Sequence, residues 1–172
     1  MSKLEKIFLF IIIVFVLLFV SILIAFSTKE KYDVSHFHEV KVSDVLDMFE
    51  DNDTHVLYVG YEDCEMCLMV NPSLEKAQVK YNYMTSYLDL ASIDFESEDW
   101  KKLKDLLNMD VEQTLSEDGS GQVVVDTFGN FLDEYGLVPT VIVIEDGKQK
   151  GGFIGGFEEE NILGWIEYIL TK

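Results

Sequence analysis

Arginine is missing from this sequence, and basic residues of any kind are few. The chain has 13 lysines against 32 aspartates and glutamates, so its net charge at neutral pH is −19. Residues 33–172 hold 30 of the acidic and 9 of the basic side chains, and this part alone carries −21. Such a surface repels the phosphate backbone of nucleic acids, which argues against nucleic-acid binding. It favours solubility and separation from an anionic membrane, and it would attract cationic peptides.

Cysteine is also scarce: it occurs only twice, at Cys64 and Cys67. The pair follows the apolar run 55–60, which predicts a buried strand, and it precedes a predicted helix at 68–80. At this spacing the two sulfurs can meet across one helical turn, and a helix N-terminus stabilises a thiolate. The sequence therefore predicts reversible dithiol–disulfide chemistry.

One long apolar run, residues 7–26, carries no charge and is broken only by Ser21 and Ala25. Twenty helical residues would span roughly 30 Å, which is the thickness of a bilayer core. We therefore expect a transmembrane anchor at 7–26, a short cytoplasmic tail at 1–6 and a tether at 27–37. A cleaved signal peptide is the alternative, although its apolar core would be shorter. No cysteine follows the run closely, so a lipoprotein anchor is not supported.

The orientation of this expected anchor is not decided by its flanking charges. Lys3 and Lys6 precede the run, while Lys29 and Lys31 follow it, so the count of positive charges is equal on both sides. The N-terminal tail is short, and a single pair of cysteines suits an oxidising compartment. We expect a single-pass protein of the cell membrane with its domain on the extracytoplasmic side.

Hydrophobic periodicity in the rest of the chain alternates between strand and helix patterns. Asp146 and Gly147 predict a hairpin turn, residues 115–122 predict a loop, and Ser43 is the expected N-cap of the first helix. Strands and helices that alternate and close with a hairpin predict an α/β domain with a mixed sheet and helices on both faces. The predicted strands are 56–60, 85–90, 141–144 and 151–154, and the predicted helices are 42–49, 68–80, 98–109, 128–136 and 158–170.

Several motifs follow one another in a fixed order over roughly residues 40–172. They are the two cysteines at a helix start, Pro72 five residues later, Val138-Pro139-Thr140, the Asp146-Gly147 turn, and Gly155-Gly156 before a C-terminal helix. This set resembles the thioredoxin superfamily. The resemblance implies a thioredoxin-like fold, a mixed central sheet flanked by helices, together with one N-terminal transmembrane helix. We place the domain at 38–172, with an insertion near 91–127.

The resemblance also implies roles for individual residues. Cys64 would be the attacking thiolate, and Cys67 would be the resolving cysteine. Pro139 would be a cis proline beside the cysteines, and Val138, Pro139 and Thr140 would bind an extended substrate strand. The alternative for Pro139 is an ordinary proline at the start of a strand. The redox-active pair would need no further cofactor and no metal.

Residues near the cysteines depart from the family's pattern. Tyr58 stands where thioredoxin has a buried acid that assists proton transfer, and Asp63 stands where the family has tryptophan. Glu62, Asp63 and Glu65 surround Cys64 with negative charge, which disfavours a thiolate. These three carboxylates are therefore expected to modulate the site and to make the redox couple less oxidising.

These features together predict a membrane-tethered thiol–disulfide oxidoreductase that acts on extracytoplasmic proteins or secreted peptides. Membrane-anchored proteins of this layout occur in Gram-positive bacteria, and the bacteriocin transport accessory proteins are one similar group. A membrane redox partner or a transporter would be the partner of such a chain. The alternative function is a non-enzymatic accessory module that holds a cationic peptide or a transporter partner while its cysteines stay idle.

Weaker alternatives concern the cysteines and their neighbours. A permanent disulfide would stabilise the helix start, but a bridge that closes so short a loop contributes little. His36 and His38 could complete a zinc site with the cysteines, although surface histidines are the simpler interpretation. Peroxide reduction is a further alternative function, but two-cysteine peroxidases usually need an arginine near the thiolate, and this chain has none. We interpret Met66, Met69, Met84 and Met109 as packing residues rather than as a set of ligands.

Overall fold

The computed structural model describes residues 12, 16, 34–115 and 121–171. The chain divides into two compact units, residues 1–31 and 32–172. Apart from residues 12 and 16, the expected anchor at 7–26 lies outside the described residues, as does the expected tail at 1–6. In the part that the structure describes, no helix is both long enough and apolar enough to cross a membrane.

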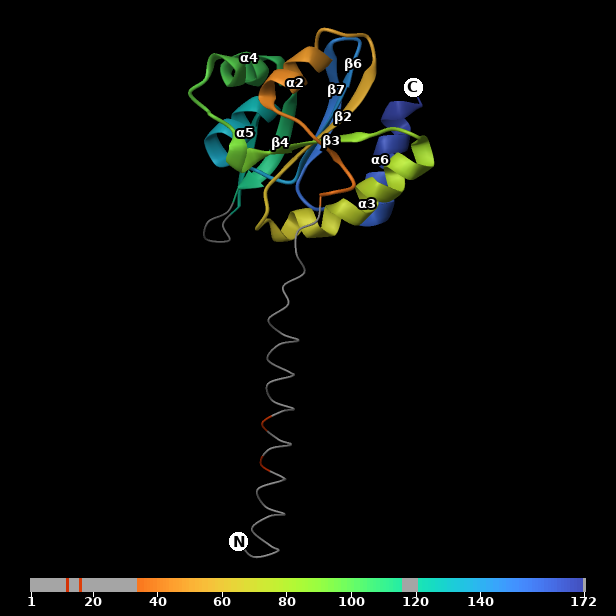
Figure 1. The fold of residues 1–172 in the computed structure, drawn as a ribbon. Coiled ribbons are helices and arrows are strands. Elements are labelled where there is room, and N and C mark those ends of the chain that lie inside the picture. Colours follow the sequence, from red (N-terminus) through yellow and green to blue (C-terminus); the bar gives the residue numbers. More distant parts are fainter. Residues whose placement is uncertain (1–11, 13–15, 17–33, 116–120, 172) are drawn as a thin grey trace, which may run out of the picture. The chain divides into compact units, whose positions relative to one another are not determined.

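A five-stranded sheet forms the centre of the domain (Figure 1). Its strands follow the order β1 (His38–Glu39), β3 (Thr85–Asp89), β2 (Thr54–Gly60), β6 (Thr140–Glu145) and β7 (Lys148–Ile154). The first three lie parallel to one another, whereas β6 runs antiparallel to β2, and β7 runs antiparallel to β6. The prediction of a mixed sheet is confirmed, and the two-residue strand β1 was not predicted.

Two layers of helices cover the sheet, because side chains along each strand alternate between its faces. On β2, Leu57 and Val59 join the core cluster of α2, α4 and α5, while Val56 and Tyr58 join the cluster of α3 and α6. Figure 1 shows α3 and α6 side by side in the second layer. The helices are α2 (Val42–Met48), α3 (Glu65–Tyr81), α4 (Glu98–Leu106), α5 (Phe128–Tyr135) and α6 (Glu159–Leu170), with a short 3₁₀ turn at Leu90–Ser92.

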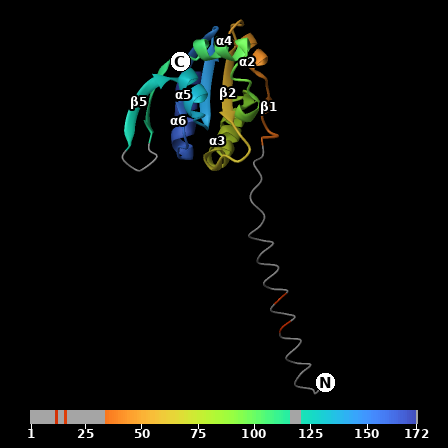
Figure 2. The ribbon, with the colours of Figure 1, turned by 90° about the vertical axis from the view of Figure 1, so that its left-hand side faces the viewer.

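The region near 91–127, which we expected to be an insertion, contains more strand than predicted. The predicted helix 98–109 ends at Leu106, and a two-stranded antiparallel hairpin follows, β4 (Asp110–Leu115) with β5 (Gln122–Thr127). Val111 and Val124 alternate with exposed residues and pack against the core of the first layer. Figure 2 shows β5 at the periphery, beside α5. Leu115 and Gln122, the two ends of the predicted loop 115–122, belong to β4 and β5, and residues 116–120 lie outside the described residues.

One helix cap and one helix start also differ from prediction. The N-cap of α2 is Lys41 and not Ser43, because the Asp44 carboxylate accepts a hydrogen bond from the Lys41 backbone N–H at 2.8 Å. A carboxylate in the first turn suits the helix dipole and satisfies a free backbone donor. Helix α3 begins at Glu65, three residues before the predicted start, so Cys67 lies inside its first turn.

The helices α4 and α5 are held together by a polar cluster that is partly buried. The Trp100 indole N–H donates to the Asp133 carboxylate at 2.8 Å, and Lys104 forms an ion pair with the same carboxylate. Burial alone would raise the pKa of Asp133, but the hydrogen bonds from Lys104 and Trp100 outweigh it and lower that pKa. A Cβ atom at Gly129 would lie 2.3 Å from the Lys104 carbonyl oxygen, so only glycine permits this close approach.

The predicted hairpin between β6 and β7 is confirmed. Asp146 and Gly147 have φ values of 51° and 67°, the left-handed pair that a two-residue hairpin turn requires. This turn closes the sheet on the side of β7, whose last residues lead into the loop before α6.

Candidate active site

The two cysteines lie where β2 gives way to α3, and they form a disulfide with a Cα–Cα distance of 5.2 Å. Cys64 is the N-cap of α3, with an extended backbone, and its Sγ atom accepts a hydrogen bond from the Cys67 backbone N–H at 3.1 Å. A sulfur therefore takes the place of the oxygen that usually caps a helix. The same position would favour a thiolate at Cys64 after reduction, since the helix N-terminus carries partial positive charge.

The two sulfur-bearing residues differ slightly in access to solvent. Cys64 is 5% exposed, while Cys67 is fully buried in the cluster between the sheet, α3 and α6. An incoming sulfur can reach only a residue that meets solvent, so Cys64 is the one placed to react first with another molecule. Pro72 lies inside α3, five residues beyond Cys67.

The segment before β6 borders the same core cluster as the two cysteines. The Val138–Pro139 peptide bond is cis, as the resemblance implied. Val138 packs against the cluster that contains both cysteines, and Pro139 is buried. The Pro139 carbonyl accepts a hydrogen bond from the Gly155 N–H at 2.8 Å, and the Thr140 hydroxyl donates to the Leu137 carbonyl at 2.7 Å. The first of these bonds joins the segment to the loop before α6, and the second lies within the segment.

Tyr58 lies in the same core cluster as the cysteines and is fully buried. Its ring makes an edge contact with Phe37, at 5.6 Å between centroids, and a tilted contact with Tyr87, at 5.4 Å. Phe37, at the end of the expected tether, is thus part of the core. At the position where the related fold has a buried acid, this chain has an aromatic group in an aromatic cluster.

We use the name acidic collar for Glu62, Asp63 and Glu65, the three carboxylates that flank Cys64. All three are exposed, and none forms an ion pair with another described residue. No cation of the described residues therefore pairs with the collar beside the disulfide, and water and salt weaken the effect of exposed charges.

Met66 and Met69, beside the cysteines, pack against other residues as expected, but both are also partly exposed. Met66 is 42% exposed and Met69 is 62% exposed. A Cβ atom at Gly156 would lie 3.3 Å from the methyl carbon of each, and one at Gly155 would lie 3.7 Å from that of Met66. The methionines therefore lie over the glycine pair. Neither periodicity nor spacing could have placed residues so far apart in the sequence in contact.

The zinc alternative is not supported by the arrangement of its ligands. Within residues 34–115 and 121–171, no group of three or more His, Cys, Asp or Glu side chains is placed to hold a metal ion. His36 and His38 belong to this described part, yet they do not gather with the cysteines. A disulfide already joins the two sulfur atoms that such a site would need.

No protein-family model matches the sequence, and no curated protein matches it. Solved structures do match. A thioredoxin from Trypanosoma brucei brucei aligns with a TM-score of 0.51 at 15% identity, over 79% of this chain and 92% of its own. Oxidized mitochondrial thioredoxin 3 from Saccharomyces cerevisiae aligns at 0.47 and 18% identity, over 80% of this chain and 97% of its own. A mutant thioredoxin from Halobacterium salinarum NRC-1 aligns at 0.47 and 16%, over 77% and 88%. The first of these likenesses shows a shared thioredoxin-like fold.

Proposed function

We propose that this chain is a thiol–disulfide oxidoreductase that works through Cys64 and Cys67. One observation carries the proposal. The two cysteines of a Cys-x-x-Cys motif form a disulfide at the N-terminus of α3, and the sulfur of the first accepts a hydrogen bond from a backbone N–H of the helix. A helix N-terminus favours the thiolate form of a cysteine there, and the thiolate is the species that attacks disulfides.

The exchange proceeds in two steps, which we write in the direction that reduces the substrate. The Cys64 thiolate attacks one sulfur of a substrate disulfide, a mixed disulfide forms, and the other substrate sulfur leaves as a thiolate. The Cys67 thiolate then attacks the Cys64 sulfur, which releases the second substrate thiolate and restores the Cys64–Cys67 disulfide. The chain loses two electrons and the substrate gains them, and the reverse sequence oxidises a substrate dithiol.

The groups around the disulfide have separate roles in this proposal. The segment of Val138, Pro139 and Thr140 lies between the cysteine cluster and the loop before α6, where an extended substrate strand would pair with the backbone. The acidic collar destabilises the Cys64 thiolate and so lowers the reduction potential. A mechanism of this kind requires no metal and no organic cofactor.

The experiment is a trapping assay with the full-length chain. Cys67→Ser leaves the mixed disulfide unresolved, so we expect covalent adducts on non-reducing gels that disappear with dithiothreitol. Cys64→Ser is the matched control, because it removes the attacking sulfur and should give no adduct. A titration of the unmodified chain in glutathione buffers then assigns the direction. A potential near or above roughly −200 mV favours oxidation or isomerisation of substrates, and one near or below roughly −260 mV favours reduction.

We also propose that residues 7–26 anchor the chain in the cell membrane, with residues 38–172 on the extracytoplasmic side. The apolar, uncharged composition of this run supports the proposal. Extracytoplasmic proteins or secreted peptides, including peptides like those handled by bacteriocin transport accessory proteins, would be the substrates. Resistance to carbonate extraction, together with protease access in intact cells, tests the anchor and its orientation. Release of the chain by carbonate would argue against it.

A second candidate function is supported by the charge of the chain. With −21 on residues 33–172, the domain could hold a cationic peptide or transporter partner without any redox step. Replacement of both cysteines by serine separates the two proposals. Binding that persists in this variant, with no reversible couple in the parent chain, would favour the accessory module.

A further inference from the structure

We propose that the groove between α3 and the start of α6 binds the substrate segment next to the reacting cysteine, and that this segment is apolar and carries lysine or arginine. The inference rests on the proposed disulfide exchange, since it names the class of substrate for that site. We use the name docking groove for this depression, which has a volume of about 440 Å³. Its lining includes Met69 and Pro72 of α3, and Gly156, Phe157 and Glu158 before α6.

The docking groove begins beside the disulfide. Met66 lies between the two cysteines in sequence, and its methyl group approaches Gly156 together with that of Met69. Gly155, the preceding residue, donates its N–H to the Pro139 carbonyl at 2.8 Å. A substrate chain that pairs near Pro139 therefore reaches the groove within one or two residues of its own cysteine.

The floor and walls of the docking groove are largely apolar. Met69 is 62% exposed and Phe157 is 47% exposed, and apolar side chains gathered in this way mark an interaction surface. Methionine side chains are flexible and polarizable, so they adapt to apolar groups of different shape. The groove should therefore accept several aliphatic or aromatic side chains and not one alone.

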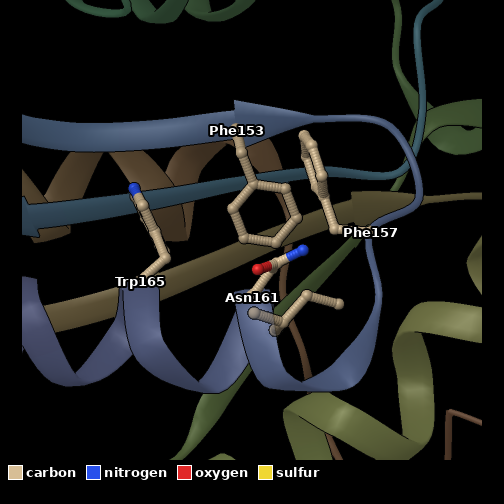
Figure 3. A pocket seen from close by; sticks show the side chains of 5 residues that line it. Phe153, Phe157, Asn161 and Trp165 are labelled. Atoms are coloured by element: carbon tan, nitrogen blue, oxygen red, sulfur yellow. The ribbon is translucent and has the colours of Figure 1, made fainter.

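Phe157 also forms a wall of a second pocket, about 260 Å³ in volume (Figure 3). Its ring makes an edge contact with Phe153, at 5.4 Å between centroids, and Phe153 makes another with Trp165, at 5.0 Å. Figure 3 shows the Asn161 side chain pointing from α6 toward the two phenyl rings, so this amide gives the pocket a polar group. A peptide that crosses Phe157 can place one apolar side chain on each side of it.

Charge decides which apolar peptides are favoured. Glu158 is exposed and forms no ion pair with any described residue, whereas Glu159 is paired with Lys76 at 2.6 Å. Glu160 and the acidic collar add further carboxylates without ion-pair partners in the described part. Complementary charge accelerates association and rejects partners of like charge. A segment with lysine or arginine beside its apolar residues fits this surface, and an acidic segment is repelled.

The test compares two peptides of equal length, each closed by one disulfide, with the full-length chain in its reduced form. One peptide carries leucine and lysine beside the disulfide, and the other carries serine and glutamate. We expect the first to be reduced at least about tenfold faster at low salt, with a difference that shrinks as salt is added. Equal rates for the two peptides would overturn the inference.

Matched variants locate the effect in the docking groove. Met69→Ala should slow reduction of the leucine–lysine peptide about fivefold, because it removes apolar contact area. Met84→Ala is the control, since Met84 is 60% exposed but lies outside the groove, and it should leave the rate unchanged. Equal effects of the two variants would contradict the docking role.

Charge reversal gives a second, independent comparison. Glu158→Lys should slow the same peptide and weaken its salt dependence, because Glu158 lines the groove and its side chain makes no capping hydrogen bond with α6. Asp99→Lys makes the same change of net charge in the first turn of α4, and it should have little effect. If the two reversals act alike, the preference reflects only the total charge of the chain, and the groove has no special part in it.

Two further outcomes separate this inference from the proposed function. Every variant should react with the small, uncharged disulfide bis(2-hydroxyethyl) disulfide at the rate of the parent, which would show that the cysteines are intact. A chain that reacts with neither peptide nor with this reagent would refute the oxidoreductase proposal and the docking role with it. If Met69→Ala instead changes the molecular mass in light scattering and leaves peptide rates unchanged, the groove is a contact between two copies, and the inference is wrong.

Discussion

Reduction of the disulfide should cost this chain little of its stability. The bridge has a sequence separation of only 3, so it closes a loop of four residues. Loop-closure entropy for four residues amounts to about 6 cal/mol/K, which is about 2 kcal/mol at 25 °C. Reduction also preserves packing, since no atom other than hydrogen is added or removed, and Cys64 can still accept the hydrogen bond from the Cys67 N–H. We expect the free energy of unfolding to fall by no more than about 2 kcal/mol.

The assay is urea unfolding of the full-length chain with and without dithiothreitol, followed by circular dichroism and tryptophan fluorescence. By linkage, a loss of about 2 kcal/mol corresponds to a reduction potential about 40 mV below that of the same disulfide in the unfolded chain. Glutathione titrations of the chain with and without denaturing urea measure this difference in potential independently, and the two values should agree. A variant with both cysteines replaced by serine is the control, and dithiothreitol should not change its stability.

A loss of about 4 kcal/mol or more would refute this reasoning. It would mean that the disulfide is a structural bridge, whose removal typically costs about 2–5 kcal/mol in small domains. The oxidoreductase proposal would then lose its main support, because a catalytic pair must pass through the reduced state in every cycle. A gain in stability on reduction would instead mean that the helix N-terminus favours the Cys64 thiolate more strongly than the acidic collar opposes it.

Three other predictions concern charge and close packing. Replacing the acidic collar with amides should raise the reduction potential by about 10–20 mV at low salt and by less at high salt, as glutathione titration would show; no change would mean that water screens these carboxylates completely. Asp133→Ala should lower the free energy of unfolding by about 2 kcal/mol, because it leaves the buried Trp100 N–H without an acceptor, while Asp133→Asn should cost less. The pKa of Asp133 is lowered in the folded chain. The contribution of Asp133 to the free energy of unfolding is therefore complete above the unfolded pKa of about 3.9, and it is lost as pH falls through the lower folded pKa. A contribution that rises on acidification would contradict this. Gly129→Ala places a Cβ atom 2.3 Å from the Lys104 carbonyl oxygen, so α4 and α5 must separate, and thermal unfolding should reveal a loss of more than about 2 kcal/mol.

The central sheet could be predicted because its strands have strong local patterns. The β-branched run of β6 and the Asp146-Gly147 turn are local signals that a single sequence displays. The hairpin of β4 and β5 was missed because neither strand alternates cleanly: Val111 and Leu115 are widely spaced among polar residues of β4, and the valines of β5 follow one another directly. Its stability comes from packing against the first layer, which local propensity does not contain.

The candidate site was predictable in part for the same reason. The cysteines and Pro139 form short motifs with fixed spacing, and their positions follow from the resemblance. The docking groove was not predictable, because it depends on contacts between Met66, Met69 and Gly156, which are far apart in sequence. The partial exposure of the methionines was not predictable either, since exposure is a property of the folded chain.

Helix α5 connects the layer of helices opposite the cysteines with the segment that borders the cysteine cluster. Helix α5 packs in the layer opposite the cysteines, and it ends at Gly136, whose φ of 58° turns the chain sharply. The Leu137 N–H donates back to the Phe131 carbonyl, and the next residues form the cis bond to Pro139. Helix α4 lies in the same layer as α5, so a probe attached to α4 would leave the disulfide face open to solution. Any rotation of α5 would at the same time move the segment that is proposed to meet the substrate, so a probe on α5 could report on the proposed reaction without covering its site.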